Sequence, residues 1–145
     1  MSDSKDTVNL LKECDAGAKM AVASFEEVVE SIQDSKLRRL LTDCKEKHEK
    51  LTTEIHSLLT EHHSPEKEPS PMAKGMSWVK TNMMLAMDES DKTVADLITD
   101  GCNMGVKSLH RYLNQYRAAD DTAKDICKRL VSLESDLSEA LRCYL

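Results

Sequence analysis

A six-residue string occurs twice in this chain and divides it into two halves. Residues 14–19 read CDAGAK and residues 102–107 read CNMGVK, so both copies follow the pattern C-[DN]-x-G-[AV]-K. Each copy lies in a stretch with helical spacing, which indicates two similar helical hairpins. Glycine inside a helix costs about 1 kcal/mol relative to alanine. A glycine at the same place in both copies therefore favours a close crossing of two helices there over a ligand-binding or hinge role.

Apolar residues around the first copy recur at the i, i+3, i+4 and i+7 spacing of one helix face. They predict a helix over about 5–33 and, after Asp34 and Ser35, a second helix that fades at His62 and His63. The inward stripe of the second helix is Leu37, Leu41, Cys44, His48, Leu51, Ile55 and Leu58. Because the connection is short, the two helices are expected to form an antiparallel hairpin over about 5–63.

The middle of the chain separates the two hairpins. Residues 64–71 contain all three prolines and predict an exposed linker. Residues 72–87 have the apolar spacing of a short crossover helix, with Trp78 as its anchor. The acidic break at 88–90 offers helix N-caps, so the second hairpin is predicted over about 90–145, with its turn at 118–121. The whole chain, 1–145, is predicted to be one all-α domain.

Composition and charge limit the classes of function. A net charge of −6, with no run of Lys or Arg, argues against binding to nucleic acid or to an anionic membrane. No apolar stretch approaches the roughly 20 residues of a spanning helix, and the polar start lacks the apolar region of a signal peptide. We therefore expect a soluble cytoplasmic protein. Its five cysteines are an odd number and are expected to be reduced thiols.

One cysteine falls in each of the four long helices, at Cys14, Cys44, Cys102 and Cys127. Counted from the turn of their hairpin, Cys14 and Cys44 differ by about 10 residues, which is roughly 15 Å along a helix. Cys102 and Cys127 differ similarly, and Zn–S bonds of about 2.3 Å cannot span such a gap. We interpret the four as buried apolar residues and expect Cys143, near the C-terminus, to be the exposed and reactive thiol.

Several motifs together resemble a known family. They are the Leu10-Leu11…Cys14-Asp15-x-Gly17 opening, the Gly75-x-x-Trp78 crossover and the acidic break before the second hairpin. The chain resembles, over nearly its whole length, the ferritin-like four-helix-bundle family called domain of unknown function 2383. The resemblance implies a ferritin-like antiparallel four-helix bundle, with a short extra helix in a long central crossover. It implies no settled biochemical role.

Related ferritin-like folds hold a di-iron centre, which needs a Glu from each of two helices and a Glu-x-x-His from each of the others. The residues three before the five histidines are Lys45, Thr53, Leu59, Thr60 and Lys107. The motif is therefore absent, and we predict neither a metal nor a cofactor. A degenerate site would have to use His48, Glu49 or Glu54. The last helix offers only Glu134 and Asp136 near the matching level.

Two further patterns have both a functional and a structural interpretation. His48 follows Cys44 by one helical turn, but no third orienting group or oxyanion element accompanies them, so a hydrogen-bonded, partly buried histidine is favoured over a catalytic pair. Methionines gather in the crossover and could suggest copper(I); they are Met72, Met76, Met83, Met84 and Met87. Filling of irregular space, or an adaptable partner surface, is the favoured interpretation.

The sequence therefore favours a non-enzymatic ferritin-like bundle, structural or stress-related, that acts through self-association or contacts with a protein partner. The alternative is a metal-binding protein or oxidoreductase with a degenerate metal site. A third hypothesis, a thiol-based redox sensor, would depend on a fast-reacting cysteine such as Cys143.

Overall fold

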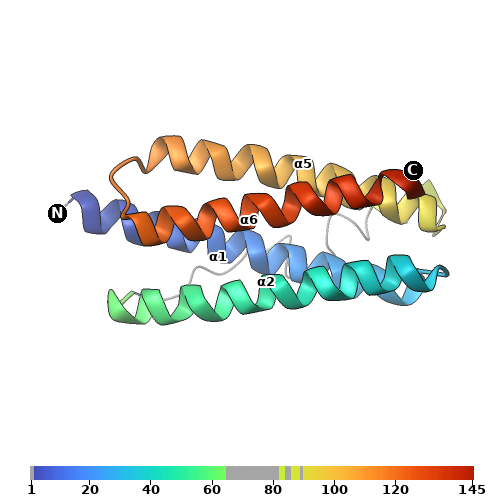
Figure 1. Ribbon diagram of the computed structural model, residues 1–145, viewed down its shortest axis with the longest axis horizontal. Helices are drawn as coiled ribbons and strands as arrows, with labels where there is room; N and C mark the ends of the chain where they lie inside the picture. The colour runs from blue at the N-terminus through green and yellow to red at the C-terminus, as the bar shows by residue number, and fades with distance from the viewer. Residues whose placement is uncertain (1, 65–81, 84–85, 89) are drawn as a thin grey trace.

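A computed structural model describes residues 2–64, 82–83, 86–88 and 90–145 of the chain. Its four long helices are α1 (Ser2–Val28), α2 (Ser35–Glu61), α5 (Asp91–Gln115) and α6 (Asp121–Ala140). Two short 3₁₀ segments, η1 (Val29–Ser31) and η2 (Leu141–Tyr144), extend α1 and α6. Figure 1 shows the four helices side by side, which confirms the predicted all-α four-helix bundle.

The helices form two antiparallel hairpins. In Figure 1, α1 and α6 run in one direction along the bundle, and α2 and α5 run in the other. The chain therefore leaves α2 at one end and enters α5 at the opposite end, as expected for a long crossover. The linker predicted at 64–71 and the crossover helix predicted at 72–87 lie mostly outside the described residues. Of the crossover methionines, Met83 is buried in the core and Met87 is exposed.

Side-chain caps explain where three of the helices begin. Asp34 accepts hydrogen bonds from the backbone N–H groups of Lys36 and Leu37 at the start of α2. Ser90, in the predicted acidic break, caps α5 through the N–H of Thr93, and Asp120 caps α6 through that of Ala123. The local sequence thus sets these boundaries.

The buried residues form two apolar clusters, one toward each end of the bundle. Along α2, Cys44 belongs to one cluster and Leu51 to the other. His48 lies between them, so the clusters meet at a polar level in the middle of the bundle. The predicted stripe omitted Leu59, which follows Ile55 by one turn and is fully buried, whereas the predicted Leu58 is partly buried and packs against the same cluster.

Each hairpin's turn is held by side chains of the other hairpin. The Asp91 carboxylate on α5 accepts hydrogen bonds from the N–H groups of Gln33 (2.8 Å) and Asp34 (2.9 Å) in the α1–α2 turn. At the opposite end, Asp6 accepts from the N–H of Ala118 and Thr7 accepts from that of Asp120. These contacts fix how far one hairpin is shifted along the other.

Replacing Asp91 with alanine is expected to lower the free energy of unfolding by about 1–3 kcal/mol, since hydrogen bonds to a charged group are lost at a partly buried turn. Urea denaturation measures the change. The matched control is Asp121→Ala, because Asp121 holds the same first-turn position in α6 and its loss removes only the favourable interaction with the helix dipole. Equal losses in the two variants would contradict a special role for Asp91.

Candidate functional site

A histidine and a glutamate form an ion pair in the middle of the bundle. His48 comes from α2 and is 0% exposed, while Glu134 comes from α6 and is 7% exposed. The Nε2 atom of His48 lies 2.6 Å from Oε1 of Glu134. The ring of Phe25, on α1, packs edge-on against the imidazole at a centroid distance of 5.4 Å. The pair is thus enclosed by three helices.

The surroundings of His48 determine its protonation state. Its Nδ1 atom lies 2.7 Å from the carbonyl oxygen of Cys44, which can only accept a hydrogen bond, so Nδ1 carries a proton. Burial by itself lowers the pKa of His48, but the hydrogen bonds to Cys44 and Glu134 and the Glu134 charge raise it to about 10. At neutral pH the ring is an imidazolium that donates from both nitrogens.

Two thiols complete this central cluster. The thiol of Cys44 lies 3.6 Å from Nδ1 of His48, and Cys102 on α5 forms a hydrogen bond with the Glu134 carboxylate. Burial, together with the Glu134 charge, raises the pKa of the Cys102 thiol far above its usual value. Cys102 therefore stays a neutral thiol rather than a nucleophilic thiolate.

The other two core cysteines meet at a different level. Cys14 and Cys127 form a hydrogen bond between α1 and α6, which raises the pKa of Cys14 and lowers that of Cys127. Spacing along the sequence relates thiols within one hairpin, so this contact between the two hairpins was not predicted. Each of the two apolar clusters thus contains two of the core thiols, and all five cysteines are free. Cys143 is exposed, as predicted.

The residues named for a degenerate metal site are mostly kept apart. Glu49 and Asp136 are exposed, and Glu54 is paired at the surface with Arg129, with oxygen–nitrogen distances of 2.7 and 3.1 Å. Only His48 and Glu134 come together. In 2–64, 82–83, 86–88 and 90–145, no group of three His, Cys, Asp or Glu residues is arranged to hold a metal ion.

The expectation that no third group orients His48 was wrong, because Glu134 does so from the other hairpin. A signal for it was present in the sequence: Glu134 lies between Leu130 and Leu137 on the buried stripe of α6. An acid on an apolar stripe needs a partner in the core. The sequence does not say which partner it finds.

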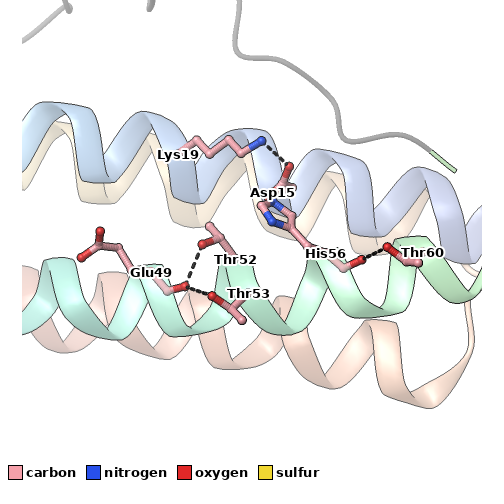
Figure 2. Close-up of polar contacts among 7 residues, drawn as sticks. All are labelled: Asp15, Lys19, Glu49, Thr52, Thr53, His56 and Thr60. Carbon is pink, nitrogen blue, oxygen red and sulfur yellow. Dashed lines mark hydrogen bonds and ion pairs between the residues drawn. The ribbon is translucent and has the colours of Figure 1, made fainter.

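A second buried acid lies between α1 and α2, as Figure 2 shows. Asp15 is 0% exposed, and its Oδ1 atom is 2.8 Å from Nε2 of His56. The Nζ atom of Lys19, one turn further along α1, lies 3.0 Å from Oδ2. Asp15 belongs to the repeated string, whose second copy has the exposed Asn103 at this position. The buried acid is therefore a feature of the first hairpin alone, where it contacts His56 and Lys19.

A cavity of about 390 Å³ lies between α1 and α5, and both repeat glycines line it. A Cβ atom added at Gly17 would meet no atom within 4 Å. One added at Gly105 would meet only the Glu134 side chain, at an ordinary 3.7 Å. The close helix crossing predicted from these glycines is therefore wrong, because they border open space rather than another backbone.

The arrangement can now be compared with solved structures. Dps92 from Deinococcus radiodurans superimposes with a TM-score of 0.76 at 12% identity, covering 100% of this chain and 88% of that one. The dodecameric thioferritin, a bacterioferritin-related protein from Bacteroides fragilis, gives 0.74 at 12% identity, over 98% and 85% of the two chains. The fold is ferritin-like. A fragment of a domain of unknown function 305 protein from D. radiodurans gives 0.73 at 14% identity, over 95% and 93%.

These likenesses, all below 25% identity, concern the ferritin-like fold alone. No protein-family model matches the chain, and no curated protein matches it. In the described part of the chain, no helix has the length and apolar character needed to cross a membrane. The ferritin-like di-metal ligand set does not fit the residues present, because the Glu-x-x-His motif is absent and Nδ1 of His48 is held by the Cys44 carbonyl while Nε2 is held by Glu134.

Proposed function

We propose that this chain is a cytoplasmic ferritin-like protein, of the family called domain of unknown function 2383, with a non-enzymatic structural role. It acts through self-association or through contacts with another protein. The observation that carries the proposal is the His48–Glu134 ion pair at the centre of the bundle. Because each of these two side chains binds the other, neither is available as a metal ligand or a catalytic group in the centre of the bundle.

The chemistry of the pair supports this proposal. A metal binds histidine through the lone pair of a neutral imidazole, whereas the pKa of His48, raised to about 10 by Cys44 and Glu134, favours the imidazolium at neutral pH. A group with a pKa of about 10 is also a poor general base at neutral pH, because it is already protonated. The Glu134 carboxylate compensates the imidazolium charge in the core. The pair is therefore better suited to fixing how the helices pack against each other than to catalysis.

Self-association is supported by exposed apolar side chains at one end of the bundle. Met87 is 91% exposed and Leu145 is 52% exposed. Figure 1 places the segment before α5 and the C-terminus at the same end. Exposed apolar groups at the same end of the bundle favour a contact with another molecule there. The solved B. fragilis protein with a similar fold is described as dodecameric.

We expect light scattering of the untagged protein to give a mass of several chains, and elemental analysis to find no stoichiometric iron, manganese, zinc or copper. Introducing Met87→Lys together with Leu145→Lys should lower the mass toward one chain, because charges at a buried contact are costly. Met104→Lys is the control, since Met104 is 54% exposed but lies within α5, away from that end. Stoichiometric metal would overturn the structural role, and a monomeric wild type would leave only contacts with another protein.

A further inference from the structure

The two repeat glycines keep space open rather than bring helices together. Gly17 lies in α1 and Gly105 in α5, and both line the cavity between these helices, as does Gly101. Cβ atoms added at Gly17 and Gly101 would meet nothing within 4 Å. Glycine weakens a helix, and no packing contact at Gly17 compensates for this. We therefore explain the repeated glycine by the cavity beside it, which a larger side chain would fill.

The cavity has the size and lining of a small-molecule site. Its volume of about 390 Å³ lies within the range of roughly 300–1,000 Å³ that is typical of ligand pockets. Phe25 and Leu130 are buried at its inner side, and Tyr112 adds a second aromatic ring. Met20 and Met104 also line the cavity, and both are about half exposed, which places flexible thioethers at its mouth. Thioethers and ring edges are favourable neighbours for an aromatic ligand.

One buried polar side chain gives the cavity its chemical preference. Glu134 lines the inner wall and is 7% exposed. One of its oxygens accepts from His48, and the other lies 3.7 Å from the Cβ position of Gly105; the Cys102 thiol also interacts with this carboxylate. A carboxylate oxygen can accept more than one hydrogen bond. The described lining residues include Glu13 and Glu134 but no Lys, Arg or His, and the nearby His48 imidazolium is already paired with Glu134, so no cation is left to bind an anionic ligand.

We propose that the cavity between α1 and α5 binds a small aromatic molecule that carries a neutral or cationic hydrogen-bond donor, such as a hydroxyl or an amine. The ring lies among Phe25, Leu130 and the two methionines, and the donor group reaches the Glu134 carboxylate. This site is independent of the contacts proposed at the end of the bundle, because none of the residues named here belongs to that surface.

Isothermal titration calorimetry of the full chain at pH 7 tests the proposal with 2-naphthol as the probe. We expect saturable binding of one molecule per chain. Naphthalene-2-sulfonate has the same rings with a negative charge, and 2-methoxynaphthalene has them without a donor. Both should bind at least tenfold more weakly, because the sulfonate finds no free cation in the cavity and neither molecule can donate a hydrogen bond to Glu134. Equal binding of the three molecules would overturn the proposed chemistry.

Variants at the glycines test the place of binding. Gly17→Leu and Gly105→Leu should each weaken 2-naphthol binding at least tenfold, while Ala23→Leu adds bulk to α1 on the side facing α2 and should leave it unchanged. Gly17→Ala should raise Tm and retain binding, since its methyl group enters open space.

Unaltered binding in both leucine variants, or a lower Tm for Gly17→Ala, would overturn the proposal. So would a change in oligomeric mass in Gly17→Leu, which would make a second copy the occupant.

Discussion

Replacing Glu134 with alanine should lower the free energy of unfolding by about 3–5 kcal/mol, because the variant leaves the His48 imidazolium buried without its counter-charge. The loss is larger than that of an ordinary hydrogen bond, since a charge in the core has no water to replace its partner. Urea denaturation at pH 7, followed by circular dichroism, measures it. The pKa of His48 should also fall in this variant, because a buried imidazole without a counter-charge is more stable in its neutral form. Loss of this proton limits the destabilisation.

Two controls separate the buried pair from ion pairs in general. Glu54→Ala removes a surface ion pair with Arg129 and should cost less than about 1 kcal/mol. The double variant His48→Leu, Glu134→Leu removes both charges and should be close to the wild type in stability, or above it. If Glu134→Ala cost no more than Glu54→Ala, the central ion pair would not have the energetic importance assigned to it.

Stability should also fall as the pH rises from about 7 toward 10. His48 has a pKa of about 10 in the folded chain, whereas its ordinary value is 6.5, so its contribution to stability is complete below pH 6.5 and is lost as the pH approaches 10. Between these values the free energy of unfolding should decline by about 1.4 kcal/mol for each pH unit. Urea denaturation at a series of pH values between 6 and 9 measures the slope.

The double leucine variant at 48 and 134 serves as the control, since it should be nearly flat between pH 7 and 9. Above pH 9 the buried Cys102 thiol adds to the loss, because burial and Glu134 raise its pKa in the folded chain and it ionises only after unfolding. A wild-type chain with no slope between pH 7 and 9 would show that His48 is not an imidazolium in the core.

The repeated glycine shows how far a local pattern can be interpreted. Its position in both halves correctly indicated that α1 and α5 correspond, but the inference of a close helix crossing failed. A glycine that permits contact and a glycine that preserves a cavity look the same in a sequence. Only the position of the neighbouring helix, about which the residues around Gly17 carry no information, distinguishes the two.

The sequence by itself determined the four helices, the two hairpins and the helix starts at Asp34, Ser90 and Asp120. These features depend on apolar spacing and capping within a few residues. Only the tertiary structure decided that His48 contacts Glu134, 86 residues further along the chain, and that Cys14 of one hairpin interacts with Cys127 of the other. The physical reason is that the shift of one hairpin along the other is set by packing and by cross-hairpin bonds such as those of Asp91. Side chains of similar spacing are compatible with more than one such shift.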